Sequence, residues 1–71
     1  MNPKTVIENY INGNLKLAKW QARGFNEAAL CLVAQQAGKS ERAARRIAFY
    51  LKHPSQATFD AACAAEAEAR Q

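Results

Sequence analysis

Long apolar runs are missing from this 71-residue sequence. No stretch approaches the roughly 20 apolar residues that a membrane-spanning helix needs. Residues 1–17 include polar side chains throughout and lack the apolar segment of a secretory signal. We therefore expect a protein that does not insert into a membrane and that stays in the cytoplasm.

Side chains typical of catalysis and metal binding are also scarce. The chain has one histidine, His53, which stands beside a proline where a helix is expected to end. Its carboxylates are scattered, and neither a glycine-rich phosphate loop nor a zinc-type spacing is present. We expect no enzymatic activity, no metal and no cofactor. Cys31 and Cys63 are interpreted as free, buried thiols, with a disulfide between them left open.

Large aliphatic and phenylalanine side chains are few as well. Leu, Ile, Val and Phe together number 13, whereas alanine alone numbers 16. Alanine is the strongest helix former and lets helices approach closely. The composition therefore predicts a single helical domain over residues 1–71 with a thin core. A domain of this size is marginal, so we also expect help from a partner or from self-association.

Capping residues and helix breakers predict the helix boundaries. The expected N-caps are Asn2, Asn14, Asn26, Ser40 and either Ser55 or Thr58. The expected ends are marked by Gly13, Gly24, Gly38 and Pro54. The third helix should direct Leu30, Val33, Ala34 and Ala37 inward. Residues 66–71 are expected to fray. The fold class is thus all-α, a compact bundle of four to five short helices.

Residues 33–47 have the pattern of a helix-turn-helix. Ala34 is small where two helices would meet, Gly38 lies at the turn, and Ser40 caps the next helix. Ala44 and Ile47 then face inward. In DNA-binding versions of this motif, the early residues of the second helix contact base edges in the major groove.

The charge distribution supports a binding role for this second helix. The chain carries a formal charge of +4, and residues 39–52 alone have five basic groups and one acidic group. Arg42, Arg45 and Arg46 would be the base-contacting residues, because arginine to guanine is the commonest base contact. Lys39 departs from the pattern, since an apolar residue usually locks the turn at that place.

A helical projection of residues 41–52 separates an apolar side from a basic one. Ala44, Ile47 and Leu51 share the apolar side. The other side comprises Arg42, Arg45, Arg46, Phe49, Lys52 and His53. Phe49 lies in the middle of the basic side, and three interpretations remain open. It packs under the fifth helix, it anchors a protein interface ringed by arginines, or it contacts a base or sugar.

The second expected helix, roughly residues 15–23, has a similar arrangement. Lys16, Lys19 and Arg23 form one stripe with Trp20 at its edge. The opposite, core-facing stripe consists of Leu15, Ala18 and Ala22. Leu17 and Trp20 fall outside the core stripe, which predicts a second buried contact with the fifth helix, with a second copy of the chain, or with a target protein.

Several short segments resemble small helical accessory proteins of tailed phages and prophages. They are residues 9–14 (Asn-Tyr-Ile-Asn-Gly-Asn), 18–19, 21–22, 50–52 (Tyr-Leu-Lys) and 59–63 (Phe-Asp-Ala-Ala-Cys). The resemblance implies a viral protein that acts in the cytoplasm of a bacterial host, where such proteins bind and redirect a host protein, for example in defence.

Two functions are therefore weighed. The first is non-catalytic binding and modulation of a host protein, with a homodimer as a further possibility. The alternative is a small helix-turn-helix regulator that binds DNA through the fourth helix. The candidate partner-binding residues are Arg42, Arg45, Arg46, Phe49, Lys52, Lys16, Lys19, Trp20 and Arg23.

Overall fold

The protein is all-α. The computed structural model describes residues 2–70. Within that range five α-helices follow one another, together with one short 3₁₀ turn, η1. Their bounds are α1 Pro3–Ile11, α2 Leu15–Gln21, η1 Ala22–Gly24, α3 Glu27–Gln36, α4 Glu41–Lys52 and α5 Gln56–Ala69. The second helix therefore ends two residues earlier than expected, because the chain tightens into η1 at Ala22.

Side-chain caps start four of the five helices. The side chains of Asn2, Asn26, Ser40 and Ser55 each accept a hydrogen bond from the backbone N–H three residues later. The Thr58 side chain in turn accepts a hydrogen bond from the Ser55 backbone N–H. This completes a capping box, in which two backbone N–H groups at the start of α5 are satisfied. Asn14 precedes α2 as predicted but makes no such side-chain bond.

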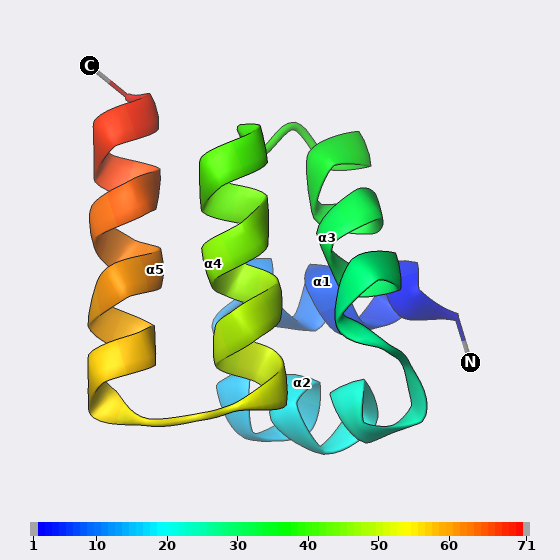
Figure 1. Ribbon diagram of the computed structural model, residues 1–71. Coiled ribbons are helices and arrows are strands. Elements are labelled where there is room, and N and C mark those ends of the chain that lie inside the picture. The colour runs from blue at the N-terminus through cyan, green and yellow to red at the C-terminus, as the bar shows by residue number, and fades with distance from the viewer. Residues whose placement is uncertain (1, 71) are drawn as a thin grey trace.

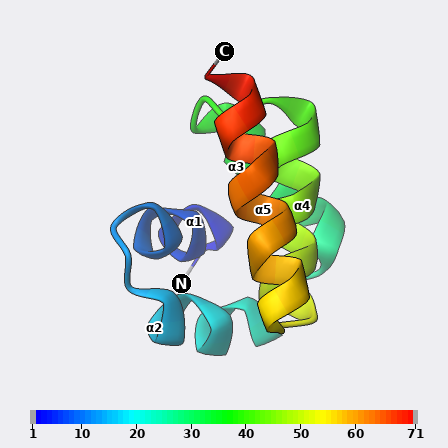
Figure 2. The same ribbon diagram turned by 90° about the vertical axis from the view of Figure 1, so that its left-hand side faces the viewer.

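The helices form two layers. Figure 1 shows α3, α4 and α5 side by side with α4 in the middle, each running opposite to its neighbour. Figure 2 shows α1 and α2 together on one side of this layer. The described residues measure 33 × 25 × 20 Å along their principal axes. α4 is thus the central element, with one face toward the core and one face left open.

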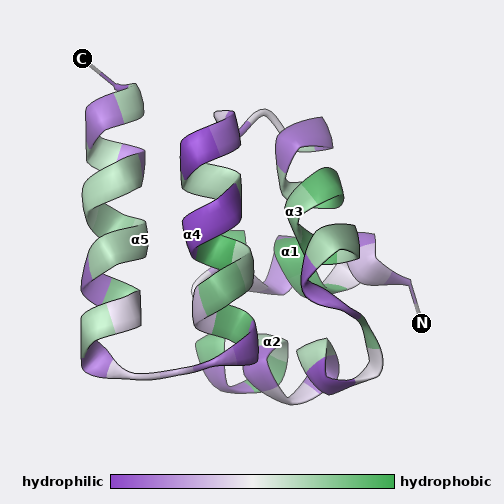
Figure 3. Ribbon diagram, viewed as in Figure 1, coloured by the Kyte–Doolittle hydropathy of each residue, from purple (hydrophilic) through white to green (hydrophobic). Residues whose placement is uncertain are grey.

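A single core lies between the layers. Its largest fully buried side chains are Ile7, Leu30, Ile47 and Val6. Eight alanines are buried around them, namely Ala18, Ala22, Ala34, Ala43, Ala44, Ala48, Ala62 and Ala65. Small side chains allow the helix backbones to approach closely, which explains how so few large residues suffice. Figure 3 shows α5 mostly pale green, as an alanine-rich helix should be, with purple bands at its polar residues.

The central pair α3–α4 has the predicted turn. Ala34, Ala44 and Ile47 are fully buried, and Gly38 adopts φ +99°, a left-handed conformation that favours glycine. The two helices lie side by side and antiparallel (Figure 1). In DNA-binding helix-turn-helix units the helices cross at about 90–120°. Here α4 instead has neighbouring helices along both of its edges.

Three local expectations are wrong. Ala37 is exposed because it is the C-cap of α3, where the inward stripe has already ended. Cys63 is exposed rather than buried, since Ala62 and Ala65 occupy the inward side of α5. Both cysteines are free. The third concerns residues 66–71, which were expected to fray, whereas α5 continues as a helix to Ala69; Gln71 lies outside the described residues.

Candidate functional site

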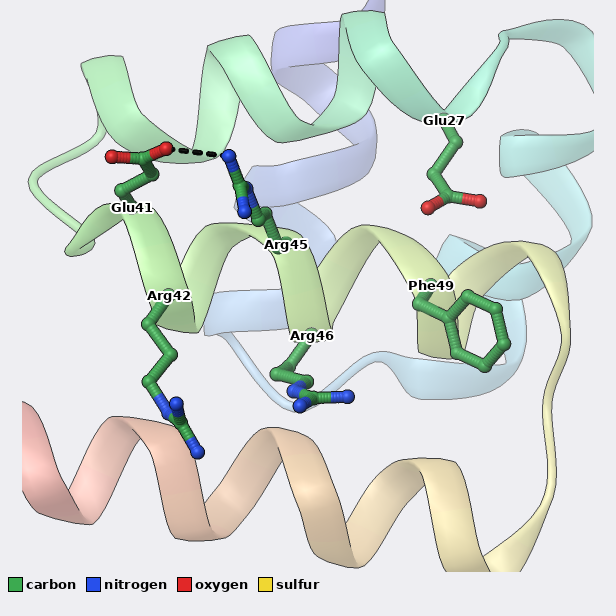
Figure 4. A pocket seen from close by; sticks show the side chains of 6 residues that line it. All are labelled: Glu27, Glu41, Arg42, Arg45, Arg46 and Phe49. Carbon is green, nitrogen blue, oxygen red and sulfur yellow. Dashed lines mark hydrogen bonds and ion pairs between the residues drawn. The ribbon is translucent and has the colours of Figure 1, made fainter.

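The open face of α4 is centred on Phe49. The buried residues of this helix are Ala43, Ala44, Ile47, Ala48, Tyr50 and Leu51, and Phe49 lies on the opposite side. Phe49 is 42% exposed, so α5 does not cover it. Figure 4 shows Arg42 and Arg46 extending toward α5 while Arg45 points the other way. The basic-aromatic face predicted from the helical projection is therefore present, and we call it the α4 face.

Carboxylates neutralise two of the three arginines on the α4 face. Arg42 Nε lies 3.1 Å from Glu68 Oε2 of α5, and Arg45 Nη2 lies 2.7 Å from Glu41 Oε1. All four side chains are more than half exposed, so each pair contributes about 0–1 kcal/mol. Arg46 makes no ion pair with another described residue.

A third carboxylate lies near the aromatic ring. Phe49 packs against His53 with ring centroids 4.8 Å apart and ring planes tilted by 40°, and His53 Nε2 lies 3.9 Å from Glu27 Oε1. Glu27, Glu41 and the arginines form with Phe49 an open hollow of about 640 Å³. Counting Glu68 as well, three arginines face three glutamates, so the α4 face has mixed charge rather than an excess of positive charge.

Lys52 does not belong to this face. Its Nζ donates hydrogen bonds to the backbone carbonyls of Ala22, at 3.1 Å, and Phe25, at 2.7 Å. Ala22 is the first residue of η1 and Phe25 is its C-cap, and the Ala22 carbonyl also accepts the Phe25 N–H at 3.1 Å. Lys52 therefore ties the end of α4 to η1, which the projection of a single helix could not reveal.

The basic stripe of α2 forms a second surface. Trp20 is 62% exposed, more than any other large apolar residue of the described chain, and Leu17 is 45% exposed. Of the three contacts left open for this pair, burial under α5 is therefore excluded. Beside Trp20 lies a hollow of about 460 Å³ between α2 and the end of α4, which we call the α2 groove. Its lining residues are Lys16, Lys19, Trp20, Arg23, Leu51, Lys52 and Pro54.

The surplus charge lies in the α2 groove. Its lining residues include four cations and no carboxylate. By contrast, the basic segment 39–52 is largely paired: besides Arg42 and Arg45, Lys39 forms an ion pair with Glu66. Lys39 departs from the usual apolar turn residue, and its ammonium instead reaches α5. The sequence alone predicted that residues 39–52 present the excess positive charge. In the folded chain most of that charge is paired with glutamates.

The sequence analysis missed the residues that set this charge balance. Glu66 and Glu68 were assigned to a fraying end, yet Glu66 accepts hydrogen bonds from both Lys39 and the Tyr10 hydroxyl, the latter at 2.9 Å. Burial, together with this hydrogen bond to Glu66, raises the pKa of Tyr10 well above its usual value. No local signal could identify contacts between residues 27 and 56 positions apart.

No family model matches this chain, and neither the curated proteins nor the solved structures provide a match to it. Within residues 2–70, no helix has both the length and the apolar character to cross a membrane. In the same range, no three side chains of metal-ligating type gather into a possible metal site. The functional argument therefore depends on the two surfaces themselves.

Proposed function

We propose that this domain is a non-catalytic binding protein that recognises another protein through its α4 face. The observation that supports the proposal most is the exposed Phe49 ring among Arg42, Arg45 and Arg46. Interface centres are enriched in aromatic residues and arginine, and a few such anchors supply most of the binding energy. The partner would offer an apolar hollow for Phe49, with carboxylates at its edge for the arginines.

The mixed charge of the α4 face favours a protein over a polyphosphate. Glu27, Glu41 and Glu68 would each repel a phosphate backbone that approached the arginines. A protein surface can instead exchange partners with the weak, exposed pairs Arg42–Glu68 and Arg45–Glu41. Arg46, which has no ion pair within residues 2–70, remains free for a partner carboxylate.

DNA binding through α4 is the second candidate function. The α3–α4 turn and the outward-facing arginines favour it (Figure 4). Against it, α4 lies between α3 and α5 and does not stand clear of its neighbours (Figure 1). The two candidates differ in salt dependence. Affinity for DNA falls steeply and linearly with the logarithm of salt concentration, whereas a Phe49-anchored interface is much less sensitive.

The proposed cellular role is that of a phage accessory protein that modulates a bacterial host protein. This part of the proposal rests on the resemblance of short segments described above. A bacterial lysate is accordingly the place to look for the partner.

Affinity capture from bacterial lysate, with and without nuclease treatment, tests the proposal. The bait is compared with its Phe49→Ala and Ile11→Ala variants. Ile11 is a matched control, since it is 47% exposed, close to the 42% of Phe49, but lies on α1. We expect one partner retained by the parent and by Ile11→Ala, and lost by Phe49→Ala because truncating a central aromatic anchor commonly costs 2 kcal/mol or more.

Arg46→Gln should mainly lower the association rate and its salt dependence, because rim charges steer encounter. Circular dichroism melts of every variant separate lost binding from lost folding. Normal capture by a folded Phe49→Ala variant would refute the protein-binding role of this face, and capture abolished by nuclease would favour the DNA alternative.

A further inference from the structure

The charged residues of the α2 groove are all positive, whereas the α4 face has charges of both signs. Four cations line it, and no described residue in its lining is acidic. Lys16 and Arg23 are exposed and make no ion pair within residues 2–70, while Lys19 lies over the Tyr50 ring, 5.9 Å from its centroid. The chain's surplus of positive charge is therefore concentrated around a single concave surface.

An aromatic platform borders these cations. Trp20 is the only tryptophan of the chain and is 62% exposed. On α2, Ala18 and Ala22 are fully buried, and a helical projection places Trp20 on the outward side, flanked by Lys16 and Arg23. An indole face next to positive groups matches the way in which bases and phosphates alternate along a nucleic acid strand.

We propose that the α2 groove binds single-stranded nucleic acid. A base stacks on Trp20, and the phosphates on either side contact Lys16, Lys19 and Arg23. Proteins that bind single strands without sequence preference combine a positive groove with stacking aromatic residues in this way. Lys52 adds charge from the other wall while its Nζ holds the carbonyls of Ala22 and Phe25. This inference does not depend on the protein-binding role of the α4 face.

The shape and the lack of acidic groups favour this occupant. A lipid surface is flat and would meet the tip of Trp20 without using the hollow of about 460 Å³ between α2 and α4. An acidic peptide would satisfy the charges but would not need an open aromatic face beside them. A single strand uses both the concavity and the indole.

Trp20 fluorescence provides the test, since no other tryptophan contributes to the emission. Submicromolar protein is titrated at low salt with a thymidine oligonucleotide of about ten nucleotides, within the usual site size of such proteins. Stacking should quench the indole, and the affinity should fall linearly with the logarithm of salt concentration. Lys16→Gln and Arg23→Gln should each reduce that slope by about 0.7, the value for one neutralised phosphate on a single strand.

Two variants locate the site with a labelled oligonucleotide. Trp20→Ala should bind about ten-fold more weakly or worse, as expected for loss of one stacked base. Arg70→Gln is the matched control, because it removes one exposed cation from the end of α5, far from α2 (Figure 1), and should leave the affinity within about two-fold. A melt of each variant confirms that it is folded.

Three results would overturn the proposal. The first is absence of quenching at low salt, and the second is an equal loss of affinity on Arg70→Gln and Arg23→Gln. The third is an affinity for polyglutamate or for anionic lipid vesicles that equals that for the oligonucleotide and responds to the same variants. Failure here would leave the capture experiment on Phe49 unaffected, because the two experiments share no variant.

Discussion

Glu66 should be the polar residue on which the docking of α5 depends most. Its carboxylate accepts hydrogen bonds from the Tyr10 hydroxyl of α1 and from Lys39 of the α3–α4 turn. The Glu66 and Lys39 side chains are 14% and 25% exposed, and Tyr10 is 7% exposed. One side chain of α5 therefore joins three parts of the fold in a setting partly shielded from water.

The change to make is Glu66→Ala, since alanine preserves the helix. The substitution leaves the buried Tyr10 hydroxyl without an acceptor, and an unsatisfied buried group costs about 1–3 kcal/mol. It also removes the partner of the half-buried Lys39. We expect a loss of about 2 kcal/mol in the free energy of unfolding. For a domain of this length, that corresponds to a fall of about 8–16 °C in Tm.

Glu68→Ala is the matched control. Glu68 lies two residues further along the same helix and pairs with Arg42, but both side chains are more than half exposed. Removing an exposed pair should cost no more than about 1 kcal/mol. Urea unfolding followed by circular dichroism measures both variants. Equal losses for Glu66→Ala and Glu68→Ala would refute the argument that shielding from water makes the Glu66 contacts strong.

Further predictions concern a helix cap, pH dependence and self-association. Ser40→Ala should cost about 1 kcal/mol in a thermal melt, because Ser40 Oγ accepts the Ala43 N–H at 3.1 Å; an unchanged melt would contradict this role of the cap. The raised pKa of Tyr10 favours the protonated phenol in the folded state. Its stabilising contribution is therefore fully present below the unfolded-state pKa of about 10 and falls as pH rises above it. Urea titrations on either side of pH 10 should show that fall, and Tyr10→Phe should reduce it. We also expect micromolar self-association through Leu17 and Trp20, which Trp20→Ala and oligonucleotide should both weaken; sedimentation equilibrium showing a 7.8 kDa monomer at high concentration would refute it.

Local sequence signals predicted the helix boundaries well. Asn2, Asn26, Ser40 and Ser55 cap the helices that they were expected to begin. Gly38 takes the left-handed conformation that ends α3. These signals act within three or four residues, so the tertiary environment adds little to them.

The helical projection also predicted which side chains of α4 share the side away from the core, but it left open whether α5 covers Phe49. Phe49 and the three arginines lie opposite the core because the 3.6-residue period fixes which side chains share a face. The same projection misplaced Lys52, whose long side chain reaches the carbonyls of Ala22 and Phe25 at η1. The helical period determines the direction in which a side chain leaves the helix. It does not determine where the charged end of a long, flexible side chain lies.

By itself, the sequence determined the all-α class, the helix limits and the amphipathic faces, because all three arise from interactions between near neighbours along the chain. Only the tertiary structure decided which charges remain available. Lys39 and Arg42 meet carboxylates of α5 because that helix lies beside α4, 26 or 27 positions away in the chain. Coulomb attraction depends on distance in space rather than on sequence separation. The surplus positive charge of the folded chain therefore lies in the α2 groove beside Trp20, and not along residues 39–52, where the sequence alone had placed it.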